Sequence, residues 1–319
     1  MAATAPPSSY EDDDDDEYDT RLVPVRPAGY RFPSADAEKV AALLRPTPFQ
    51  AQCLRWTVII AAAMCALVAL VLFIIVAASD DIDLILRTYT LWRDGAVGTV
   101  ASDPLPSPVR ALHGDQNVAL IFAFAAAFAA FAFALCWFLQ NEQLREIARG
   151  SNIYVWLNFI ISQVPLAIGV AFVAGISELT TLILYGSVIY ALWVIVALGD
   201  VSNAHVYRFF MHRYGYAFSW AYLAFGVPLF LVWLGVTLAH IGHTYGGSPS
   251  GPDIYIVLPV LLFIFQILQV LVLVLNHFSV VFFASTIWRD IILYILNGLL
   301  CVSLPIVAAI VFSTDPFDT

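Results

Sequence analysis

Charged residues are scarce in this chain, and their scarcity excludes an ordinary soluble globular protein. Lys, Arg, Asp and Glu make up 12% of the 319 residues, whereas about a quarter is usual in soluble domains. Hydrophobic residues account for 61% of the chain, where about half is usual. The composition therefore predicts an integral, multi-pass membrane protein whose main partner is the lipid bilayer, with no nucleic-acid partner.

Cysteine is also sparse, and catalytic motifs are missing. The four cysteines, Cys53, Cys65, Cys136 and Cys301, are scattered through apolar segments without a CxxC spacing. This pattern favours small core or lipid-facing residues over a disulfide framework or a metal site. The sequence has no nucleophile–base arrangement, no Gly-rich phosphate loop and no HExxH motif, so we expect no enzymatic activity.

Much of the acidic charge lies in a single run near the N-terminus. The net charge is -10, and the run EDDDDDEYD covers residues 11–19. The first 45 residues are rich in Pro, Ser and Asp and lack apolar periodicity, which predicts a disordered acidic tail over residues 1–48. A Ca²⁺-binding or partner-binding role for this run is an alternative. A solvated tail is favoured because no Gly-turn ligand spacing follows.

Long apolar runs follow the tail, and each is long enough to span a bilayer. A helix needs about 20 apolar residues to cross ~30 Å of hydrocarbon. These runs predict a membrane domain over residues 49–314, followed by a short C-terminal tail at 315–319. The seven predicted spans are 54–78, 117–139, 155–175, 179–199, 216–240, 254–277 and 289–312.

Positively charged residues gather on one side of these spans. Because cytoplasmic flanks carry an excess of Lys and Arg, we predict a cytoplasmic N-terminus and an outer C-terminus. The outer side has only Arg87, Arg93 and Arg110. The cytoplasmic side is assigned Arg21, Arg26, Arg31, Lys39, Arg45, Arg55, Arg145, Arg149, Arg208, Arg213 and Arg289.

The longest predicted loop, 79–116, falls on the outer side. Its segment LILRTYTLW at 84–92 is rich in β-branched and aromatic residues and is followed by RDG. This pattern predicts a short strand and a turn, a hairpin-like structure lying against the bundle. A structureless loop of this length is unusual in a compact fold, so we expect it to be ordered.

Polar residues within the spans mark the faces that point into the bundle, since lipid offers them no partner. Asn158, Ser162, Pro165 and Gly169 fall on one helical stripe of the third span. Gln266 and Gln269 share a face of the sixth span, and Asn297 precedes Cys301 by about one turn in the seventh.

These polar stripes have two interpretations. One is a polar pathway or ligand cavity, and the other is hydrogen bonding between helices, worth ~0.6 kcal/mol per contact. The second is favoured because the stripes contain amides and hydroxyls, while Asp200 and Glu178 are expected at span ends in contact with water. A proton or cation relay would instead place a carboxylate at depth.

His240 and His243 form an HxxH pair at the outer end of the fifth span. Two imidazoles at this spacing could hold a metal ion, but no third ligand is evident in the sequence. We therefore treat the pair as a weak metal candidate and favour an interfacial polar pair.

The segment 149–203, which begins RGSNIYVWLNFIIS, resembles the third and fourth helices of heliorhodopsins. That family tends to show R-G-x-N, then W-I-E-Y with a following Ser, then a G-I turn with an acidic residue. The predicted orientation and the long outer loop are similar as well, and the resemblance covers most of residues 50–312. It implies a homodimer and an all-α, seven-transmembrane-helix rhodopsin-like bundle. The matching positions are Arg149, Gly150, Asn152, Trp156, Ser162, Gly175, Ile176 and Asn203.

Two departures separate the chain from retinal chemistry. In heliorhodopsins the W-x-E position supplies the counterion of a protonated retinal Schiff base, and here that position is Asn158. Schiff-base formation also needs a lysine amine in the seventh helix, but the only lysine of the chain is Lys39. The alignment places Cys301, or a neighbour such as Leu300, where the family has lysine.

We therefore expect a non-photochemical, heliorhodopsin-like membrane protein with a binding, receptor-like or scaffolding role and no covalent retinal. A bound lipid could occupy the former retinal pocket. The alternatives are a structural subunit of a larger membrane complex and a channel or transporter for a neutral solute. The residues expected to line the vestigial pocket are Asn158, Ser162, Trp193, Trp233, Gln266, Asn297 and Cys301.

Overall fold

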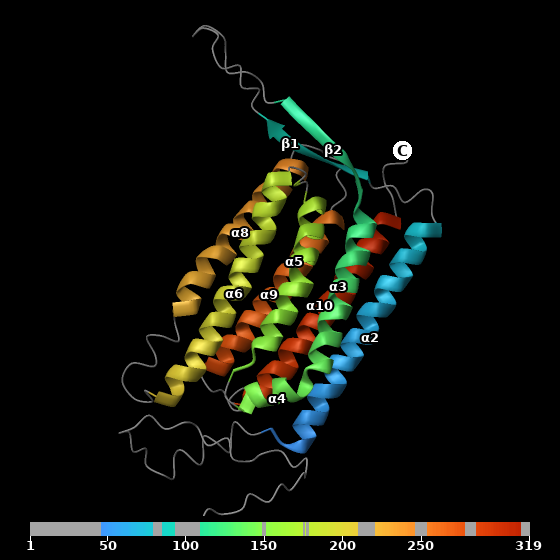
Figure 1. Cartoon of the computed structure of the whole chain (residues 1–319). Helices are drawn as coiled ribbons and strands as arrows, with labels where there is room; N and C mark the ends of the chain where they lie inside the picture. Colours follow the sequence, from blue (N-terminus) through green and yellow to red (C-terminus); the bar gives the residue numbers. More distant parts are fainter. Residues whose placement is uncertain are drawn as a thin grey trace, which may run out of the picture.

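In the computed structural model, long helices pack side by side and a pair of strands lies at one end of the bundle (Figure 1). The structure describes residues 46–78, 85–92, 109–148, 151–174, 176, 179–209, 221–245, 254–277 and 285–313. The long helices are α2 (Pro48–Ala78), α3 (Val118–Phe138), α5 (Ile153–Val173), α6 (Leu179–Phe209), α8 (Ala221–Tyr245), α9 (Ile254–His277) and α10 (Thr286–Ser313).

Six of these helices, namely α2, α3, α5, α6, α9 and α10, are long and apolar enough to cross a membrane. Helix α8 contains a shorter apolar stretch, Gly226–His240, within the described residues. The chain is thus an integral multi-pass membrane protein built as an all-α bundle, which confirms that part of the sequence analysis. The seventh span and the orientation stay predictions.

Two differences from the predicted helices have local causes. Helix α6 continues to Phe209 instead of ending at 199, because Asp200 forms an ion pair inside the bundle and does not need bulk water. A further helix that was not predicted, α4 (Gln140–Ala148), buries Gln143, Leu144 and Ile147 on one face. The predicted tails lie outside the described residues, apart from positions 46–48.

Two helix starts follow from local sequence. Before α2, the Gln50 backbone N–H donates to Thr47 Oγ1, and the Thr47 backbone N–H donates to Gln50 Oε1. This is a capping box, with Pro48 at the first helical position, where its missing N–H costs nothing. Before α5, Asn152 accepts a hydrogen bond from the Tyr154 backbone N–H. Its Nδ2 also donates to Asp290, so Asn152 links the start of α5 to α10.

Helix α5 is the central helix of the bundle. It contacts α3, α6, α9 and α10. In its apolar 18-residue stretch, 67% of the residues are buried, against 33% in the corresponding stretch of α2. Helices α5 and α3 approach closely at Gly169, where a Cβ atom would lie 3.1 Å from the Phe122 ring of α3. Helix α2 packs against α3 and α10 and leaves much of its surface facing outward.

The strands β1 (Ile85–Trp92) and β2 (Val109–Asn117) pair antiparallel, with an irregularity between Thr88 and Tyr89. They lie at the end of the bundle where α2 ends and α3 begins, opposite α4 (Figure 1). Strand β1 contacts α6. Apart from Asn117, the pair falls within the segment 79–116 for which the sequence predicts a strand and turn, while residues 93–108 lie outside the described part.

Candidate functional site

Polar side chains from three helices meet inside the bundle, and we call them the amide cluster. Every member is no more than 1% exposed, so the cluster is shielded from both lipid and water. Most of the predicted pocket residues belong to it. Its members are Asn158, Ser162 and Gln163 of α5, Gln266 and Gln269 of α9, and Asn297 of α10.

Asn297 connects α10 to α5. Its Nδ2 donates to Asn158 Oδ1 at 2.7 Å and to Ser162 Oγ at 2.9 Å. The Ser162 hydroxyl in turn donates to the Asn158 backbone carbonyl at 2.7 Å. These contacts favour the interhelical hydrogen-bonding interpretation of the polar stripe, since Asn158 and Asn297 bond to each other directly.

Gln163 joins α9 to the same cluster, and the sequence analysis missed it. Its Nε2 donates to Asn297 Oδ1 at 2.8 Å and to Gln269 Oε1 at 3.0 Å. Its Oε1 accepts from Gln266 Nε2 at 3.3 Å. The sequence signal that could have identified Gln163 is an amide side chain in the middle of a span. Gln163 lies about 100° around the helix from Ser162 and so falls outside the stripe that contains Ser162.

The cluster is neutral, which limits its chemistry. Asn158 Nδ2, Gln266 Oε1 and Gln269 Nε2 have no hydrogen-bond partner among the described residues. An unpaired buried polar atom of this kind costs about 1–3 kcal/mol. Such atoms can hydrogen-bond to a small neutral molecule, but the cluster contains no charged side chain that would pair with an ion.

Cys301 lies at the edge of the amide cluster. Its Sγ is 3.9 Å from Asn297 Oδ1, and Cys65 of α2 lies beside it. Both cysteines are buried and free. The side chain at this position of α10 is therefore a thiol packed against its neighbours.

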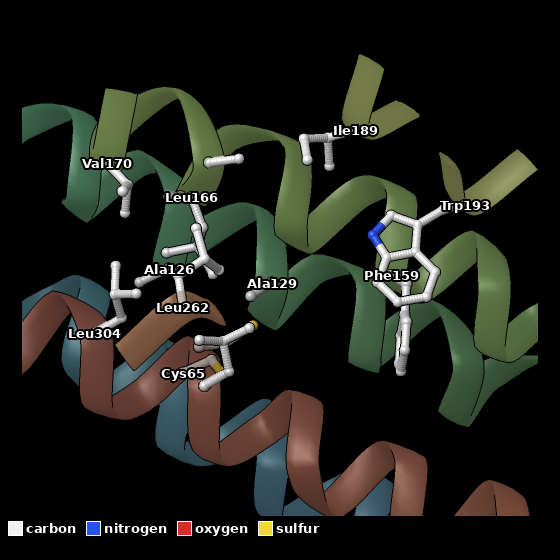
Figure 2. Close-up of a cluster of buried hydrophobic side chains, with 14 of the residues drawn as sticks. Cys65, Ala126, Ala129, Phe159, Leu166, Val170, Ile189, Trp193, Leu262 and Leu304 are labelled. Atoms are coloured by element: carbon white, nitrogen blue, oxygen red, sulfur yellow. The ribbon is translucent and has the colours of Figure 1, made fainter. Parts of the chain in front are cut away.

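Beyond the amide cluster, toward the strand end of the bundle, three leucines from different helices come together. Leu166 of α5 lies about one turn past the cluster, Leu304 of α10 lies about two turns past Asn297, and Leu262 of α9 precedes Gln266 by one turn. All three are fully buried, and Figure 2 shows their side chains gathered between the helices. We call these residues the apolar layer. It fills the bundle where a polar pathway would have to continue.

The two tryptophans of the predicted pocket belong to separate aromatic groups. Trp193 stacks on Trp156 and meets Phe159 edge-on, with ring centroids 6.2 Å and 4.8 Å away; Figure 2 shows Trp193 beside Phe159. Trp233 packs against Phe263 at 4.5 Å. Both indoles are 1% exposed. In this structure they pack against other rings, and among the described residues neither indole N–H has a hydrogen-bond partner, in the amide cluster or elsewhere.

A charged group is buried nearer the α4 end, and we call it the Arg289 cluster. The Arg289 guanidinium contacts Asp200 at 2.5 Å and Asp290 at 2.7 Å. Asn152 Nδ2 donates to Asp290 at 2.8 Å, and Trp156 Nε1 donates to Asp200 at 3.0 Å. Arg289 and Asp290 are 3% and 0% exposed. One cation thus holds two carboxylates.

This arrangement corrects two expectations from the sequence. Asp200 was expected in contact with water, but its side chain is only 11% exposed and pairs with Arg289. Arg289 was counted among the basic residues that flank the spans, but it is buried inside the bundle. The orientation prediction therefore depends on the other basic residues, of which Arg55 and Arg145 are exposed at the α4 end.

The histidine pair stays a weak metal candidate. His240 is partly buried on α8, while the side chain of His243 lies outside the described residues. No group of three His, Cys, Asp or Glu side chains suited to a metal ion is present among the described residues.

No protein-family model and no curated protein matches this chain.

Proposed function

We propose that the chain is a non-photochemical, heliorhodopsin-like membrane protein with a binding, receptor-like or scaffolding role. The observation that carries this proposal is the bond from Asn297 to Asn158 and Ser162. Position 158, to which the resemblance assigns a counterion, is therefore hydrogen-bonded to neutral side chains. Helix α8 is the seventh helix of this architecture, and a second copy of the chain is a partner that the resemblance implies.

The absence of both the Schiff-base lysine and the counterion carboxylate supports this proposal. A buried protonated Schiff base needs a nearby anion, because an unpaired buried charge costs several kcal/mol. When the lysine is absent, a carboxylate at position 158 would itself be the unpaired charge. An amide keeps the hydrogen bonds and removes that charge. The only lysine, Lys39, precedes α2 in the sequence, so no amine within the membrane helices can hold retinal.

The packing of the interior favours binding over transport. The apolar layer, formed by Leu166, Leu262 and Leu304, lies across the route from the amide cluster toward the strand end and is fully buried. The surfaces available for a binding role are then the outward faces of the helices and the strand pair. No catalytic reaction is part of the proposal.

A channel for a neutral solute is the second candidate, because three polar atoms of the amide cluster have no hydrogen-bond partner within the described part of the chain. Osmotic swelling of proteoliposomes that contain the full chain distinguishes the two functions. The vesicles are placed in glycerol or urea, and light scattering monitors their swelling. We expect the same swelling rate as in empty vesicles. Faster swelling that Asn297→Leu abolishes would contradict a purely binding role and support the channel.

A further inference from the structure

A groove runs along the outer surface between α2 and α3. It encloses about 500 Å³, and almost all of its wall is apolar. It is lined by small side chains of both helices, such as Ala62, Ala66 and Ala134, and by the aromatic rings of Phe131 and Trp137. Alanines alone would only indicate close packing of two helices, but here they line an open groove on the surface of the bundle.

A second hollow of about 540 Å³, with both polar and apolar lining, adjoins the apolar groove at the α4 end. Ile59 lines both hollows, so they are continuous along α2. The second hollow is lined by Gln52, Arg55, Gln140 and Asn141. Gln140 Nε2 also donates to the Ala51 carbonyl at 3.4 Å, which holds the start of α4 against α2. The combined groove is therefore apolar in one half and partly polar in the other, at the α4 end.

The groove is shorter than one leaflet of a bilayer. On α2 its apolar part runs from Ile59 to Ala66, seven residues further along the helix, or about 10 Å along the helix axis. One leaflet contributes ~15 Å of hydrocarbon, half of the ~30 Å bilayer core, so the groove can hold about two-thirds of the extended length of one acyl chain. Trp56 and Trp137 are 55% and 38% exposed beside the groove, and exposed tryptophans are enriched where headgroups meet hydrocarbon.

The charge at the polar end selects one class of lipid. Arg55 is exposed, and no described residue forms an ion pair with it. Arg145 on α4, by contrast, pairs with Glu142 at 2.7 Å. A free guanidinium binds a phosphate well because it offers several N–H donors in a planar fork. The predicted cytoplasmic position of this end also faces the leaflet that carries anionic lipids.

We propose that this groove is a binding site for one anionic phospholipid. Arg55, with Gln52 and Asn141 beside it, binds the headgroup phosphate. One acyl chain lies in the apolar groove over Ala62 and Ala66, between Phe131 and Trp137. The site is on the outer surface of α2 and α3, so it does not depend on the amide cluster or on the function proposed above.

Native mass spectrometry of the purified full chain tests the site. The protein is stripped of lipid and titrated with dioleoyl phosphatidylglycerol or with dioleoyl phosphatidylcholine, which has the same acyl chains. We expect one tightly held phosphatidylglycerol per chain and weaker binding of phosphatidylcholine. Arg55→Gln should weaken phosphatidylglycerol binding about fivefold, the effect of one basic residue at an anionic surface, and leave phosphatidylcholine unchanged.

Two further variants separate a built site from general adhesion of lipid. Ala66→Phe fills the groove and should weaken both lipids, whereas Ala77→Phe adds the same ring to an exposed position of α2 outside the groove and should weaken neither. Arg145→Gln removes a basic residue at the same end and should have no effect. Equal binding of the two lipids, or equal effects of Arg55→Gln and Arg145→Gln, would overturn the proposal.

Discussion

Replacing Arg289 with methionine should destabilise the folded chain by about 3–5 kcal/mol, the usual cost of leaving buried charge without its partner. Arg289 is the only cation within ion-pair distance of Asp200 and Asp290 among the described residues. Methionine retains most of the apolar stem of arginine, so the loss reports mainly on charge. Equilibrium unfolding of the purified chain in mixed detergent measures the effect.

Two controls isolate the buried charge as the cause. Arg145→Met breaks an exposed ion pair with Glu142 and should cost less than about 1 kcal/mol. Combining Arg289→Met with Asp200→Asn and Asp290→Asn should recover much of the lost stability, because the two carboxylates are then neutral. If Arg289→Met cost no more than Arg145→Met, the guanidinium would have to be hydrated and the Arg289 cluster would not be a buried one.

Replacing Asn158 with glutamate should lower the free energy of unfolding by roughly 3 kcal/mol, within the several kcal/mol expected for an ion without a counterion in the interior. The new carboxylate could still accept from Asn297 Nδ2, which now donates to Asn158 Oδ1. All six side chains of the amide cluster are neutral, however, so none balances the charge. Thermal unfolding of the variant and the parent chain in the same detergent provides the comparison.

Asn141→Glu is the matched control for this substitution. Asn141 is exposed on α4, so the same chemical change there should alter stability by no more than about 0.5 kcal/mol. An unchanged unfolding temperature for Asn158→Glu would mean that water reaches position 158. The interior would then be open, and the channel interpretation would gain support over the closed amide cluster.

The helices could be predicted from the sequence because the thickness of a bilayer constrains the length of apolar runs. The run at 254–277 coincides with α9, and the run at 117–139 differs from α3 by one residue at each end. Polar residues interrupting such runs also pointed correctly to Asn158, Ser162 and Asn297, since lipid cannot satisfy their hydrogen bonds. Both predictions depend only on local sequence and the solvent.

The partners of these residues could not be predicted, because they come from helices distant in sequence. Asp200 and Arg289 are 89 residues apart, and Gln163 meets Asn297 across 134. The sequence does contain a partial signal: Asp290, Asn297 and Cys301 recur on one stripe of α10, at intervals of seven and four residues. Assigning their partners requires knowing that α10 lies between α5, α9 and α2.

Addition of all-trans retinal to the purified full chain tests the central claim most directly, namely that the chain has left retinal chemistry. Cys301 has a thiol and Asn158 an amide at the positions that the proposed likeness to heliorhodopsins assigns to the Schiff-base lysine and its counterion. We predict no visible absorption band that survives denaturation as a covalent adduct. A stable band that persists after denaturation would contradict the account.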